Sequence, residues 1–131
     1  MSSSGRIVRL AVAMLAPVAL SGCLELSGPD ACTAEYVPGL DVAVERTDTG
    51  DPVVDALVVA RDGGFADSAR TSLLPGDSDS AAAQLAHERS GEYDVTVEKD
   101  GYESSVRRDV KVEENECHVE TVEFTVGLEP S

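Results

Sequence analysis

The sequence contains no tryptophan and few other aromatic residues: three tyrosines and two phenylalanines make up 4% of 131 residues. Basic residues are also scarce, since 10 lysines and arginines stand against 25 acidic residues, for a net charge of −15. Such a surface repels phosphate backbones and anionic headgroups, which excludes a nucleic-acid binder and disfavours membrane binding through a basic patch. The apolar fraction of 42% still permits a folded core, and the length allows one domain.

Long apolar runs are missing as well. The run Leu10 to Leu20 covers eleven residues, well short of the roughly 20 that a membrane-spanning helix needs. Arg6 and Arg9 precede it, and this order of charge and apolar run is typical of a secretory signal peptide. We therefore expect residues 1–22 to be an export signal. Its removal takes away two arginines and no acidic residue, which moves the net charge from −15 to −17.

The end of this signal carries a short motif, Leu20-Ser21-Gly22-Cys23. It resembles the lipobox of bacterial lipoproteins, which implies that Cys23 is diacylated and becomes the N-terminus. Each buried methylene contributes about 0.8 kcal/mol, so two or three acyl chains on one cysteine would anchor the protein stably. The alternative is an ordinary cleaved signal that leaves Cys23 as a structural cysteine. Leu24, where an aspartate would resemble an inner-membrane retention signal, permits delivery to the outer membrane or cell surface, facing periplasm or exterior.

The cysteine count agrees with this interpretation. There are three cysteines, and lipidation of Cys23 leaves Cys32 and Cys117. In an oxidising compartment these two are expected to form a disulfide. Metal ligation or a redox pair are the alternatives, but the two cysteines form no CxxC motif and have no histidine at metal-ligand spacing.

From residue 39 onward, apolar residues recur with a period of two, the pattern of half-buried β-strands. Residues 23–38 lack such a period and are expected to form a tether that becomes ordered near Cys32. Six or seven short strands separated by turn residues predict an antiparallel sandwich. The expected strands include Leu40–Glu45, Val53–Arg61, Glu92–Glu98, Val106–Val112 and Cys117–Leu128, the last with a bulge or two-sided burial near Thr121. Leu74–Ser80 is expected to be a loop, and residues 80–89 either helical turns or, from Gln84, a strand leading into the Tyr93 hairpin.

Two motifs carry a family resemblance. The segment Thr49–Val59 is similar to the opening "TG.P…A.V.V" of carboxypeptidase regulatory-like domains. Gly91–Val97, then Gly101-Tyr102 and Val110–Val112, resemble that family's "G.Y.V.V…GY…V.V". The resemblance implies a seven-stranded Greek-key β-sandwich of the prealbumin-like type over residues 39–129. The departure is Asp55, where many members carry glycine.

Candidate chemistry is sparse. The two histidines, His87 and His118, lie far apart in sequence and are expected to be solvated or hydrogen-bonded. Asp77–Ser80 begins like a calcium loop but has Ala82 where the EF-hand pattern requires glycine, and Asp48 with Asp51 could hold Ca²⁺ only weakly. Transthyretin-like hydrolases have a C-terminal Tyr-Arg-Gly-Ser, whereas this chain ends Gly127–Ser131. We therefore expect no catalytic residue, no metal and no cofactor.

These observations favour a non-catalytic, lipid-anchored module of the cell envelope with a protein-interaction or structural role. The alternative is a module that binds carbohydrate or another small ligand at the sandwich edge. A transthyretin-like hydrolase is the remaining alternative. The acidity is interpreted as an adaptation of solubility to a high-salt habitat, or as complementarity to a cationic partner. The expected contacts are thus the membrane, through the anchor, and an envelope protein or polysaccharide.

Overall fold

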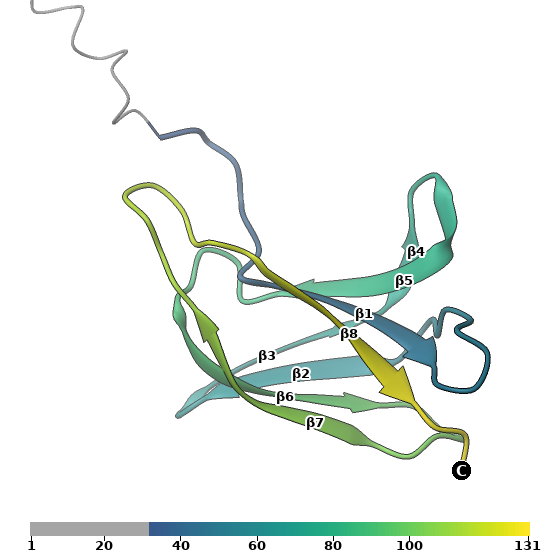
Figure 1. The fold of residues 1–131 in the computed structure, drawn as a ribbon. Helices are drawn as coiled ribbons and strands as arrows, with labels where there is room; N and C mark the ends of the chain where they lie inside the picture. The colour runs from purple at the N-terminus through teal and green to yellow at the C-terminus, as the bar shows by residue number, and fades with distance from the viewer. Residues whose placement is uncertain (1–31) are drawn as a thin grey trace, which may run out of the picture. The chain divides into compact units, whose positions relative to one another are not determined.

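The structure is a computed structural model that describes residues 32–131, and Figure 1 shows these residues as two layers of β-strands. The predicted signal at 1–22, the lipidation residue Cys23 and most of the tether lie outside the described residues. The strands are β1 (Leu40–Arg46), β2 (Leu57–Asp62), β3 (Phe65–Arg70), β4 (Ser72–Leu74), β5 (Asp77–Leu85), β6 (Gly91–Glu98), β7 (Ser105–Val112) and β8 (Val122–Leu128). Residues 32–131 contain no helix, and so none that could cross a membrane. The all-β class is therefore confirmed.

The eight strands form two four-stranded sheets. One has the order β4-β5-β1-β8 and the other β3-β2-β6-β7. All neighbours pair antiparallel except β1 and β8, which run parallel from Leu40 opposite Val122 to Arg46 opposite Leu128. The first and last strands of the domain therefore lie side by side, as Figure 1 shows for the blue and yellow arrows.

Both sheets bury their inward side chains in one shared core. The largest fully buried residues are Leu40, Val42 and Val44 of β1, Val58 of β2, Leu85 of β5, Tyr93, Val95 and Val97 of β6, Val112 of β7 and Leu128 of β8. The period of two in the sequence is thus the period of burial, because alternate side chains of a strand face the same side. The rings of Phe65, Tyr102 and Phe124 pack at the margin of this core, half-buried.

The segment from Leu74 to Ser80 is not the loop that its composition predicts. β4 and β5 pair as a hairpin here, and only the two-residue turn Pro75-Gly76 remains outside the strands. β5 continues to Leu85, so residues 80–85 are strand and not helix. The predicted strand from Gln84 to Arg89 is wrong beyond Leu85, since residues 86–89 turn away. β6 then pairs with β2 and β7 instead of with this segment.

Two predicted strands are shorter than expected. Residues 53–56 form a turn before β2, because the buried hydroxyl of Thr71 hydrogen-bonds to backbone groups on both sides of it. Asp55 has a φ of 63° in this turn, the left-handed conformation that glycine adopts most readily. Residues 117–121 are likewise not part of β8. The side-chain oxygen of Asn115 accepts hydrogen bonds from the backbone amides of Cys117 and His118, and such local bonds replace a strand ladder.

Candidate functional site

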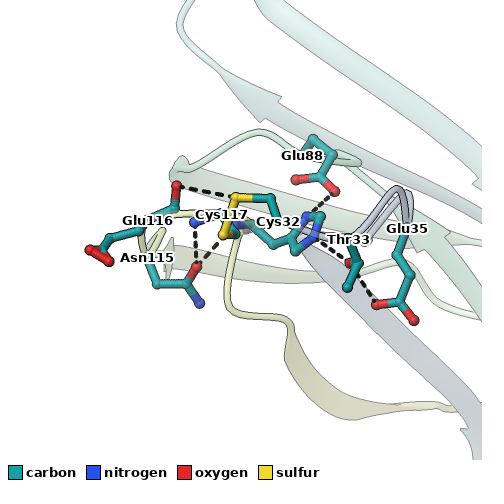
Figure 2. The surroundings of a disulfide bond; sticks show 8 residues. Cys32, Thr33, Glu35, Glu88, Asn115, Glu116 and Cys117 are labelled. Carbon is teal, nitrogen blue, oxygen red and sulfur yellow. Dashed lines mark hydrogen bonds and ion pairs between the residues drawn. A yellow bond between two sulfur atoms is a disulfide. The ribbon is translucent and has the colours of Figure 1, made fainter. Parts of the chain in front are cut away.

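The predicted disulfide joins Cys32 to Cys117, with an S–S distance of 2.05 Å across 85 positions of sequence. It connects the segment before β1 to the turn that precedes β8, as Figure 2 shows. Residues 32–38, termed the strap below, have no regular secondary structure. The covalent bond and several polar contacts nevertheless hold the strap against the sheets.

The far end of the strap is fastened through its backbone. The amide of Val37 donates to the Glu88 carboxylate at 2.9 Å, and the Glu88 amide donates to the Val37 carbonyl at 2.8 Å. The hydroxyl of Thr121 donates to the Pro38 carbonyl at 2.7 Å. At Gly39 the chain passes so close to the Ala86 carbonyl oxygen that an added Cβ would lie 2.8 Å from it. The strap therefore enters β1 through a position that only glycine fits without a shift.

His118 links the strap to the turn after β5. Its Nδ1 lies 2.7 Å from the Glu88 carboxylate, and its Nε2 lies 2.9 Å from the hydroxyl oxygen of Thr33. Both ring nitrogens are thus engaged, which fixes the orientation of the imidazole. The Thr33 hydroxyl, the His118 imidazole and the Glu88 carboxylate are hydrogen-bonded in series, in the same order as the nucleophile, base and orienting acid of a catalytic triad. In this structure the three groups join segments that lie 85 and 30 positions apart in sequence.

The turn at residues 86–89 carries unusual backbone geometry. Ala86 and Glu88 both have a φ of 54°, a conformation that costs roughly 1–2 kcal/mol for a residue other than glycine. Specific contacts hold it in place. The Ala86 amide donates to the Asp67 carboxylate at 2.8 Å, and the bonds between Glu88 and Val37 hold the other end. These two positions direct the Glu88 carboxylate to His118.

Arg89 completes this turn on the side of the core. Its guanidinium lies 3.9 Å from the centre of the Phe65 ring and donates to Asp62 at 3.1 Å and to the Tyr93 hydroxyl at 3.0 Å. The Tyr93 hydroxyl in turn donates to the Arg89 carbonyl at 2.8 Å. The hydrogen bonds to the Tyr93 hydroxyl and to Asp62 raise the pKa of Arg89. The ring of Tyr93 is thus buried while its hydroxyl is bonded to a backbone carbonyl.

The second histidine also contacts the strap. His87 stacks on Tyr36 with ring centres 4.5 Å apart and an interplanar angle of 9°. Tyr36 is 73% exposed, so its ring covers the histidine and contributes little to the core. The two histidines that the sequence separates by thirty-one positions thus both bind the strap.

The residues that the sequence offers as possible metal ligands do not come together in the structure. Asp77–Ser80 lies in β5 rather than in a loop. Arg46 binds both carboxylate oxygens of Asp48, at 2.8 and 3.0 Å, and its hydrogen bond lowers the pKa of Asp48. Across residues 32–131, no three His, Cys, Asp or Glu side chains lie close enough together to hold a metal ion.

Sequence reasoning located the disulfide but missed Thr33, Tyr36 and Glu88. Their partners are distant in sequence, so no local motif marks them. When the chain is compared with models of known protein families and with curated proteins, neither comparison yields a match. The residues of this site form a disulfide and hydrogen bonds that connect the strap, the 86–89 turn and the turn before β8.

Acid is expected to weaken the hydrogen bond between the Val37 amide and the Glu88 carboxylate. The amide of Val37 donates to Glu88 and, with His118 adding a smaller effect, lowers the pKa of this carboxyl. A carboxyl with a lowered folded-state pKa stabilises fully above its unfolded pKa of about 4.3 and loses this contribution as the pH falls through the folded value. We expect the protection of the Val37 amide in hydrogen-exchange NMR, taken relative to the intrinsic exchange rate at each pH, to fall as the Glu88 carboxyl becomes protonated in acid.

The variant Glu88→Gln should already show faster exchange at neutral pH and should lose this acid dependence. Glu120→Gln is the matched control, since Glu120 is exposed and its side chain has no hydrogen bond or ion pair within residues 32–131. If exchange of the Val37 amide depended on acid equally in Glu88→Gln and in the unaltered protein, Glu88 would not be the group through which acid acts on this amide.

Proposed function

We propose that this protein is a lipid-anchored module of the cell envelope, tethered through Cys23, whose sandwich serves a non-catalytic role in protein interaction or in the structure of an assembly. The proposed organisation is a lipoprotein signal at 1–22, a tether at 23–38 and, over 39–129, a Greek-key sandwich of the prealbumin-like, carboxypeptidase regulatory-like type. The two-sheet fold and the motifs at Thr49–Val59 and Gly91–Val112 support the fold assignment.

The observation that carries the proposal is the place where the tether meets the fold. Cys32 follows Cys23 by nine positions, a distance of roughly 30 Å at full extension. At Cys32 the chain is joined covalently to the turn before β8. A force on the tether therefore reaches the turn before β8 through the disulfide as well as β1 through the strap, so the load is divided between two segments. Such a second attachment suits a domain that is held at a surface by its N-terminus.

Labelling with an alkyne fatty acid in a bacterial host tests the anchor. The unaltered protein should carry the label and sediment with membranes, whereas Cys23→Ser should be unlabelled and leave the membrane fraction. Ser21→Ala is the matched control, because it changes one residue of the motif Leu20–Cys23 but keeps a small residue there and keeps the lipidation residue, and it should remain labelled. Label that persists in Cys23→Ser, or that never attaches to the unaltered protein, would contradict the anchor.

A further inference from the structure

A cavity of about 510 Å³ lies at the end of the sandwich opposite the disulfide. It is termed the far-pole cavity, and its lining includes Asp55, Arg70, Glu98, Lys99, Tyr102 and Ser104. β6 starts next to the 86–89 turn and runs eight residues before it ends at the cavity, roughly 23 Å at about 3.3 Å per residue. The volume is within the range of about 300–1,000 Å³ that is usual for small-molecule sites.

One wall of the cavity is the turn at residues 53–56, which Thr71 holds rigid. Thr71 is 3% exposed, and its hydroxyl donates to the Val53 carbonyl at 2.6 Å and accepts from the Ala56 amide at 3.0 Å. The Asp55 amide donates to the Thr71 carbonyl at 2.8 Å. Asp55 is thereby kept at its φ of 63°, with Arg70 donating to its carbonyl at 3.2 Å. A strained residue held by a buried network is a common feature of binding sites.

The other wall is the turn from Lys99 to Tyr102. The Tyr102 amide donates to the Lys99 carbonyl at 3.0 Å, and Gly101 adopts a φ of 88° that this turn requires. The C-terminal segment braces the turn, since the Ser131 amide donates to the Gly101 carbonyl at 3.0 Å. Leu57 and Glu98, which pair across β2 and β6, connect the two walls. The cavity is therefore built from backbone that is fixed on both sides.

The chemistry of the lining is polar and of mixed charge. Three carboxylates, two cations and the half-buried ring of Tyr102 line the cavity, and Leu57 is the single aliphatic residue of the lining. Within residues 32–131, the side chains of Glu98 and Lys99 form no ion pair, so both remain available to a ligand. Hydrogen-bond donors and acceptors thus both line the cavity, together with one amphipathic ring.

We propose that the far-pole cavity binds a neutral saccharide unit. Each sugar hydroxyl both donates and accepts, which suits carboxylates beside Arg70 and Lys99, and the apolar face of a pyranose suits the ring of Tyr102. The net charge of −15 disfavours an anionic ligand, and the polar lining disfavours an apolar one. The site lies wholly within residues 55–104 and does not depend on the lipid anchor, so the two proposals fail separately.

The test is a calorimetric titration of the full-length protein, purified in a detergent without a sugar headgroup, with maltotetraose, cellotetraose and N-acetylchitotetraose. At least one should bind with a Kd on the order of 1 mM. Asp55→Asn and Tyr102→Leu should each raise this Kd at least about tenfold. Asparagine tolerates the left-handed conformation, so Asp55→Asn stays folded even if loss of the Tyr102 ring perturbs the core.

Two matched controls separate this site from other surfaces. Tyr36→Leu removes the same ring at the opposite pole, and Glu123→Gln removes one exposed carboxylate from β8. Both should bind as the unaltered protein does. Absence of heat of binding with all of the tetrasaccharides at millimolar concentration would overturn the proposal. Binding that Tyr36→Leu abolishes and Asp55→Asn leaves intact would also overturn it.

Discussion

The double variant Cys32→Ser/Cys117→Ser is expected to lose about 4–5 kcal/mol of the free energy of unfolding. The disulfide closes a loop of 85 positions, and in the chain-entropy model a loop of this length strongly restricts the unfolded chain. A domain of this size has about 5–15 kcal/mol of stability in total, so the variant would be marginal or unfolded at physiological temperature. Urea denaturation followed by circular dichroism measures the difference.

Reduction of the unaltered protein provides the control for this experiment. Treatment with a thiol reductant should give the same loss as the double variant, because both open the same loop. The serine substitutions alone should have little further effect, since Cys32 is exposed. A loss below about 1 kcal/mol would mean that the unfolded chain is already compact between these positions, contrary to the chain-entropy account.

Thr71→Val is expected to destabilise the protein by about 2–6 kcal/mol, although the two side chains have nearly the same shape. The Thr71 hydroxyl satisfies both the Val53 carbonyl and the Ala56 amide in a buried position. Valine would leave these two backbone groups without a partner, and each buried, unsatisfied group costs about 1–3 kcal/mol. Urea denaturation again provides the measurement.

Thr71→Ser is the matched variant. Serine keeps the hydroxyl and both hydrogen bonds and loses one methyl group, for which we expect a cost of about 1 kcal/mol. If Thr71→Val proved as stable as Thr71→Ser, the hydroxyl would not be what holds the 53–56 turn. The left-handed φ of Asp55 would then need a different explanation.

The parts of the fold that could be predicted from sequence are those in which one face of a strand is buried. Leu40, Val42 and Val44 alternate with polar residues, and Tyr93, Val95 and Val97 do the same. All six are fully buried. The disulfide could also be predicted, since the expected export and lipidation of Cys23 leave two thiols, Cys32 and Cys117, to pair. Both inferences rest on rules that hold without knowledge of the neighbours in space.

The remainder depends on contacts that have no local signal. The 53–56 segment is apolar and β-branched, yet Thr71, fifteen or more positions away, turns it out of the strand. Ala86 and Glu88 adopt the left-handed backbone conformation, although neither is a glycine or asparagine, the residues from which this conformation is usually predicted. The hydrogen bond between His118 and Thr33 likewise joins residues that lie 85 positions apart, so no local pattern predicts it.

The parallel pairing of β1 with β8 has a consequence for how the chain acquires its structure. Leu40 lies beside Val122 and Arg46 beside Leu128, so one edge of the first strand has no partner until the last ten residues are available. Closing so large a loop costs entropy before any contact repays it, and folds dominated by such pairings form slowly, in milliseconds to seconds. The newly made chain therefore passes through an interval with an open β-edge, during which aggregation or proteolysis competes with completion of the sheet.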